Sequence, residues 1–194
     1  MNLALAFALG ALTGDPASTK EAMRPVQLLV GEWRVTVSED GEAAKGWEET
    51  QAWEYRIEKD QYSLEFTVKD GKRFKEGLLS YDLKRKLYRL DAVRVDGKKA
   101  AFEGKLLVKE LVLEELAPEG AAAERLNFNF LRDIRFIGSV ERREAGSKTW
   151  NESHQYQFTR AGVSIVRSEG PKCVVTGGTG TIAVEHGGKT YYVC

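Results

Sequence analysis

Hydrophobic and polar residues alternate along most of the chain, from Trp33 to about Arg160. The first run places Trp33, Val35 and Val37 on one face, with polar residues between them. The same period of two recurs in the runs 53–57, 62–68, 102–108, 126–130, 134–140 and 150–158. Period two is typical of a strand with one buried face. The pattern predicts nine or ten strands and no amphipathic helix longer than a turn or two.

Turn signals separate several of these runs. Asp70-Gly71 and Asp96-Gly97 supply residues that tolerate positive φ, so they indicate tight hairpins between antiparallel neighbours. A meander of many half-buried strands must hide its apolar face and its open edges, and a closed up-and-down barrel does both. We therefore expect an all-β domain over residues 24–162, an antiparallel up-and-down β-barrel. A two-sheet sandwich is the alternative.

The chain begins with an uncharged apolar run over residues 1–12, which stops at Thr13-Gly14-Asp15-Pro16. That length suits the hydrophobic region of a secretory signal and is shorter than the roughly 20 residues that span a bilayer. We expect a signal peptide over residues 1–17, export to the periplasm or the extracellular space, and no stable membrane span. A buried or frayed N-terminal helix is the alternative. Residues 17–23 then suit a short helix or linker, closed by Pro25.

The start of the first strand carries a short motif, Gly31-Glu32-Trp33. It resembles the G-x-W motif of lipocalins and related calycin barrels. The run 28–33 is similar to the opening of a lipocalin-like group of uncharacterised bacterial proteins. The resemblance implies that Trp33 closes one end of the barrel and that the interior is able to carry a small apolar ligand.

Five residues on the presumed inner face are candidates for lining such a ligand site: Trp33, Trp53, Phe128, His154 and Tyr156. Small barrels fill their interiors with side chains, so a plain core role competes with this interpretation. Alternation places His154 on the same face as Trp150 and Tyr156. An interior histidine binds haem in nitrobindin-like calycins, but a hydrogen-bonded core histidine is the commoner outcome, and haem is not expected here.

The last 32 residues, 163–194, differ from the rest of the chain in residue pattern and contain both cysteines, Cys173 and Cys194. This segment begins with a cysteine in a glycine-rich turn and continues with a strand, a turn and a returning strand that ends in the second cysteine. This order of elements resembles that of the YHS/TRASH metal-binding modules. The resemblance implies a zinc or copper ion bound by Cys173 and Cys194. The family continues with a further cysteine and a helix, and two thiolates do not complete a structural zinc site. A fragment, ligands from a partner chain and a simple disulfide remain open, and His186 is expected to be an exposed turn residue.

Composition narrows the function classes. The chain has 194 residues and equal numbers of positive and negative residues, 29 each, so one main domain and no net attraction to nucleic acid or an anionic membrane are expected. The pairs 48–49 and 114–115 are glutamates whose side chains point to opposite strand faces, and we expect them to be surface charge. No catalytic motif is present, so the protein is not expected to be an enzyme. The sequence favours an exported metal-binding protein; the alternative is a carrier of a small apolar ligand, with the cysteines as a disulfide.

Overall fold

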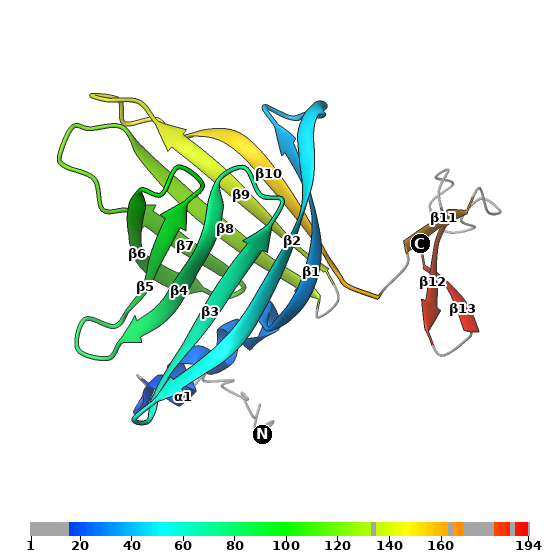
Figure 1. The fold of residues 1–194 in the computed structure, drawn as a ribbon, viewed down its shortest axis with the longest axis horizontal. Coiled ribbons are helices and arrows are strands. Elements are labelled where there is room, and N and C mark those ends of the chain that lie inside the picture. Colours follow the sequence, from blue (N-terminus) through cyan, green and yellow to red (C-terminus); the bar gives the residue numbers. More distant parts are fainter. Residues whose placement is uncertain (1–15, 133–134, 163–164, 169–180, 187–188, 194) are drawn as a thin grey trace, which may run out of the picture.

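Ten antiparallel strands form a closed barrel in the order β1-β10-β9-β8-β7-β6-β5-β4-β3-β2 (Figure 1). The computed structural model describes residues 16–132, 135–162, 165–168, 181–186 and 189–193. The strands are β1 (Gly31–Glu39), β2 (Glu42–Glu58), β3 (Gln61–Lys69), β4 (Phe74–Asp82), β5 (Leu87–Arg94), β6 (Lys99–Leu107), β7 (Glu110–Glu115), β8 (Ala123–Arg132), β9 (Arg135–Arg143) and β10 (Asn151–Arg160). The predicted all-β, up-and-down barrel is confirmed, and the sandwich is excluded.

Two short helices lie ahead of the barrel, α1 (Thr19–Met23) and the 3-10 helix η1 (Arg24–Leu29). The Ser18 hydroxyl accepts a hydrogen bond from the Glu21 backbone N–H at 3.3 Å and so caps α1. Three of their side chains are fully buried in the main core: Met23, Val26 and Leu29. The expected short helix is therefore present, and the pair of helices closes one end of the barrel, called the plug end below.

Trp33 lies at the plug end and is completely buried. Its indole Nε1 donates a hydrogen bond to the Leu29 carbonyl at 2.7 Å. The Arg160 guanidinium lies 5.4 Å from the Trp33 ring centroid and donates to the Val30 carbonyl at 3.0 Å. Trp33 thus joins the plug to β1 and β10, in agreement with its expected place at one end of the barrel.

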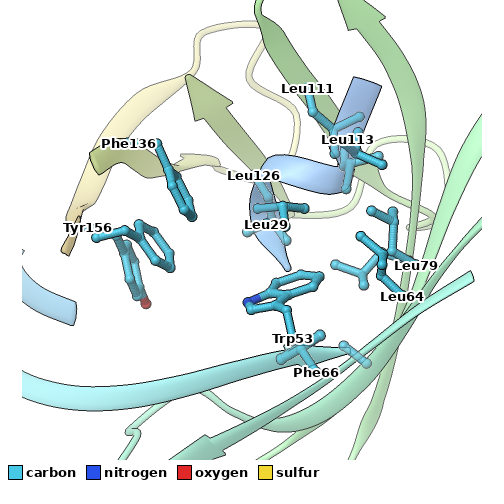
Figure 2. Packing of buried hydrophobic residues seen from close by; sticks show 14 of the residues in the cluster. Leu29, Trp53, Leu64, Phe66, Leu79, Leu111, Leu113, Leu126, Phe136 and Tyr156 are labelled. Atoms are coloured by element: carbon cyan, nitrogen blue, oxygen red, sulfur yellow. The ribbon is translucent and has the colours of Figure 1, made fainter. Parts of the chain in front are cut away.

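Aromatic side chains occupy much of the interior. Phe136 stacks on Phe158 with ring centroids 4.0 Å apart, and Trp53 stacks on Phe66 at 4.6 Å. Figure 2 shows Phe136 and Trp53 entering the same core from different strands, with leucines around them. These contacts fill the barrel with side chains, as small barrels usually are filled.

The strand order assigns every connecting turn to one end of the barrel. The turns at residues 59–60, 83–86 and 108–109 lie at the plug end with α1, whereas those at 40–41, 70–73, 95–98, 116–122 and 144–150 lie at the opposite end, called the mouth. The two hairpin signals, Asp70-Gly71 and Asp96-Gly97, fall in the β3–β4 and β5–β6 connections, as predicted.

A register shift in β10 corrects one prediction. Between Glu152 and His154 the pairing with β9 slips by one residue, at Ser153. The bulge changes which residues face inward, so Trp150 does not share the inner face with His154. The Trp150 ring instead lies between the Arg125 and Arg143 guanidinium groups, at 4.6 and 4.9 Å, on the outer side of β8 and β9.

Three further strands form a separate sheet in the order β11-β12-β13: β11 (Ile165–Ser168), β12 (Thr181–His186) and β13 (Lys189–Val193). The β12–β13 pairing agrees with the two expected strands, and residues 187–188 between them lie outside the described residues. Cys173 and Cys194 lie outside the described residues, and so does nearly all of the predicted signal peptide. Within the described part of the chain, no helix is long and apolar enough to cross a membrane.

Candidate ligand site at the mouth of the barrel

A row of polar side chains runs along the inner face of β2. Period-two spacing brings Trp47, Glu49, Gln51 and Trp53 to the same side of the strand. Glu49 accepts hydrogen bonds from the Trp47 indole at 2.7 Å and from the Gln51 amide at 2.6 Å. The Trp53 indole donates to the Gln51 side-chain oxygen Oε1 at 3.1 Å. This chain of hydrogen bonds leads from the mouth down into the aromatic core.

An ion-pair network centred on Glu124 lies across the mouth. The Glu124 carboxylate accepts from Arg73 Nη2 at 2.7 Å, Arg94 Nη1 at 2.9 Å and Arg142 Nε at 3.2 Å. Arg94 also donates to Glu115 at 2.8 Å. Burial alone would raise the pKa of Glu124, but the charges and hydrogen bonds of Arg73 and Arg94 outweigh it and hold that pKa at about 2. Glu124 is therefore ionised at neutral pH.

The β3–β4 loop brings Arg73 over the mouth. The Arg73 carbonyl accepts a hydrogen bond from the Val95 N–H at 3.0 Å, which ties the loop to the neighbouring β5–β6 turn. The Lys72 ammonium lies 5.2 Å from the Trp47 ring centroid. A Cβ on Gly71 would lie 2.5 Å from a Val68 methyl carbon, so any larger residue requires the loop or the Val68 side chain to shift. The loop acts as a partial cover held at several points.

His154 lies beside this network with a defined tautomer. The Ser153 hydroxyl donates its only proton to the Val140 carbonyl at 3.0 Å, so its oxygen must accept from His154 Nδ1 at 3.0 Å. Burial, with the nearby charges of Arg73 and Arg142, lowers the pKa of His154 below its ordinary value. His154 is thus a buried histidine with a proton on Nδ1, and in its neutral form Nε2 is the acceptor nitrogen.

Two buried donors at the site have no hydrogen-bond partner among the described residues, the Tyr156 hydroxyl and Arg73 Nε. Burial raises the pKa of Tyr156 above its ordinary value, so the hydroxyl keeps its proton. The Arg73 charge acts on Tyr156 in the opposite sense, lowering that pKa, which indicates that the two groups lie in one electrostatic neighbourhood. An unpaired buried donor costs about 1–3 kcal/mol of folding free energy, so the lack of a partner for each of these two donors needs an explanation.

A small cavity lies beneath the network. Its walls include the rings of Trp53, Phe66 and Phe128, together with Gln51 and Tyr156, and its volume is about 40 Å³. That space holds roughly two or three water molecules. A more open groove of about 330 Å³ lies above the same network, between the β5–β6, β7–β8 and β9–β10 turns. The site therefore combines a narrow, mostly aromatic interior with a charged entrance.

The five sequence-predicted ligand residues occupy different places. Trp53, Phe128 and Tyr156 line the cavity. His154 is buried next to Trp47, with ring centroids 5.6 Å apart, and is hydrogen-bonded, as the core interpretation expected. Trp33 is at the plug end. The structure thus brings three of the five around one cavity, while His154 and Trp33 lie outside its lining.

Sequence reasoning missed the charged part of the site. We expected all four glutamates of the pairs 48–49 and 114–115 to lie on the surface, and this is wrong for two of them. Glu49 is only 5% exposed, and Glu115 forms an ion pair with Arg94 inside the mouth. The expectation that neighbours point to opposite faces is correct. The missed signal was the alternation itself, because Glu49 has the same parity as Trp53, which was assigned to the inner face.

Among the described residues, no group of three or more His, Cys, Asp or Glu side chains could hold a metal ion. The predicted zinc or copper site at Cys173 and Cys194 falls outside those residues, and His186 belongs to a strand whose side chains are not described. The metal site stays a prediction from the sequence.

Comparisons with known proteins do not assign the chain to a family. No family model matches it, and no curated protein matches it. Among solved structures, the chain is similar to the one described as "Crystal Structure of Rv2717c from M. tuberculosis", with 16% sequence identity and a TM-score of 0.48. The match covers 72% of this chain and 96% of that chain.

Proposed function

We propose that the protein is a non-enzymatic carrier that holds a small, uncharged, amphipathic molecule at the mouth of its barrel. The observation that carries this proposal is the unpaired, buried Tyr156 hydroxyl in the wall of an aromatic cavity. A second unpaired buried donor, Arg73 Nε, belongs to the ion-pair network at the mouth. A ligand oxygen that accepts from the Tyr156 hydroxyl removes the desolvation cost of that donor and gains affinity. Its apolar part would lie against Trp53 and Phe128.

The size and charge of the site define the ligand class. Three arginines and two glutamates form the ion-pair network, and the buried Glu49 adds a third carboxylate on the inner face, so these six charges balance when all are ionised: Arg73, Arg94, Arg142, Glu49, Glu115 and Glu124. A neutral carbonyl oxygen keeps this balance, whereas a carboxylate adds an unpaired buried charge. A drug-sized ligand normally needs about 300–1,000 Å³, so the 40 Å³ cavity suits only one end of a small molecule.

The test uses three probes of similar shape: acetophenone, which has a neutral acceptor, ethylbenzene, which has none, and benzoate, which is charged. Quenching of tryptophan fluorescence and calorimetric titration would measure binding. We expect acetophenone to bind about fivefold or more tightly than ethylbenzene, because one hydrogen bond contributes about 1 kcal/mol. We expect benzoate to bind more weakly than acetophenone.

Two tyrosine variants supply the matched controls. Tyr156→Phe should abolish the preference for acetophenone and leave the free energy of unfolding unchanged or slightly higher, because its hydroxyl has no partner. The Tyr88 hydroxyl donates to the Ala22 carbonyl at 2.6 Å at the plug end, so Tyr88→Phe should cost about 1 kcal/mol of stability without changing the preference. An acetophenone preference that survives in Tyr156→Phe would contradict the proposal.

A second candidate function, binding of zinc or copper after export, is favoured by the two cysteine motifs and by the pairing of β12 with β13 between them. We expect one metal ion per chain and at least tenfold weaker binding in Cys173→Ser and Cys194→Ser. Metal titration with free-thiol quantification measures this and separates metal thiolates from a disulfide. Binding that survives both substitutions would rule out the thiolate site.

A further inference from the structure

Two hairpin tips lie next to each other at the plug end. One is the β4–β5 turn with its flanking residues, 82–87, and the other is the β6–β7 turn with the last three residues of β6 and the first of β7, 105–110. Because β5 pairs with β6, with Tyr88 opposite Gly104, the tips that continue beyond this pair are neighbours on the same rim. We call residues 82–87 and 105–110 together the paired tips.

The paired tips expose apolar side chains. Leu83 is 37% exposed, Leu107 55% and Val108 98%. Isolated apolar residues on a surface are ordinary, but three on two adjacent turns form a local apolar projection. Nothing among the described residues covers Val108.

The backbone at Val108 adds a second, independent observation. Its φ is +39°, in the left-handed region that a β-branched side chain disfavours. Glycine or asparagine would adopt this turn without strain. A strained valine that contributes nothing to the core is consistent with selection for an exposed apolar group at this point.

The charge around these apolar residues is strongly one-sided. The paired tips contain five cationic residues, Lys84, Arg85, Lys86, Lys105 and Lys109, against the two anionic residues Asp82 and Glu110. Arg85 is fixed by its ion pair with Glu103. With Glu103, the partner of Arg85, included, the local excess is two positive charges, five minus three, which the whole-chain balance of 29 positive and 29 negative residues conceals.

Exposed apolar tips surrounded by lysines have the chemistry of a peripheral membrane contact. We propose that the plug end docks on an anionic phospholipid surface, with Leu83, Leu107 and Val108 entering the boundary between headgroups and acyl chains. The lysines then lie at headgroup level, and the mouth faces away from the lipid. This surface is separate from the ligand site and does not depend on the carrier function.

The test is co-sedimentation of the full chain with vesicles of phosphatidylglycerol and phosphatidylcholine, compared with vesicles of phosphatidylcholine alone. We expect binding to the anionic vesicles that weakens as salt is raised. Leu107→Ser should weaken the binding about tenfold. Replacing both Lys105 and Lys109 with glutamine should weaken it about fivefold per lysine at low salt.

Val108→Gly gives a sharper test because its two effects have opposite signs. It should raise the melting temperature by relieving backbone strain, and it should weaken vesicle binding by removing the most exposed apolar group. The matched control for Leu107→Ser is Leu116→Ser, which removes a leucine of almost equal exposure, 53% against 55%, from the β7–β8 turn at the mouth. That variant should bind vesicles like the unmodified chain.

Three results would overturn the proposal. Equal binding to anionic and neutral vesicles would remove the role of the lysines, and equal effects of Leu107→Ser and Leu116→Ser would remove the role of the tips. If the tip variants instead reduce self-association in analytical ultracentrifugation and leave vesicle binding unchanged, the surface serves a second copy of the chain.

Discussion

At the residue scale, Glu124 is the clearest case of a side chain whose role depends on distant partners. It accepts hydrogen bonds from arginines in the β3–β4 loop, β5 and β9, so no local sequence pattern reveals its environment. Arg73 is equally hidden, since it lies in a loop that an alternation pattern does not describe. Trp53, Phe128 and Tyr156 could be found from the sequence because their apolar rings follow the strand period.

Glu124 also gives a pH prediction. Its pKa is about 2 in the folded protein, against an ordinary value of 4.5, so its ionised form stabilises the fold above pH 4.5 and this stabilisation is lost as the pH falls toward 2. The gap corresponds to roughly 3 kcal/mol. Glu124→Gln should lower the free energy of unfolding at pH 7 by about that amount and flatten its decline between pH 5 and 2.

Urea unfolding at a series of pH values measures this effect. Glu144→Gln, at an exposed position of the mouth, is the control and should keep the acid-dependent decline of the unmodified protein. An unchanged decline in Glu124→Gln would show that Glu124 does not control acid stability.

At the element scale, the strands were predictable, but their irregularities were not. Alternation indicates a strand wherever one face is buried, which is why the inner face of β1 could be assigned in advance. A bulge breaks the period by a single residue, and its cause lies in the pairing with a neighbour. Ser153 in β10 is such a case, and it put Trp150 on the wrong face in the sequence-based prediction.

The β3–β4 loop is the element whose geometry most directly affects the site. In Gly71→Ala, the new methyl group would lie 2.5 Å from a Val68 methyl carbon and 3.2 Å from the Glu49 carboxylate, so the loop must shift. We expect a loss of about 1–3 kcal/mol of stability and altered fluorescence of Trp47, which lies under Lys72.

Chemical unfolding and fluorescence spectroscopy check this prediction. Gly97→Ala, in the β5–β6 turn, is the control because its new Cβ meets no atom within 4 Å. Its φ of +83° should cost about 1 kcal/mol without moving the mouth. Identical spectra for Gly71→Ala and the unmodified protein would show that the loop absorbs the methyl group in place.

At the scale of the whole molecule, the closed barrel followed from a general argument: many strands with one apolar face and no covering helices must curl onto themselves. The difference between the two ends did not follow from it. That difference depends on where η1 folds back and on which loops carry arginine, and both are decided by contacts between segments far apart in the sequence. Net charge was equally uninformative, because it averages a basic rim with the acidic residues elsewhere.

The buried helices at one end also have a kinetic consequence. With Met23, Val26 and Leu29 filling that end, we expect a guest to pass through the mouth, where the β3–β4 turn that carries Gly71 also holds Arg73. If association and dissociation both require the turn to open, the rate of opening limits both. Loosening the turn should therefore speed uptake and release alike, while leaving the equilibrium between them almost where it was.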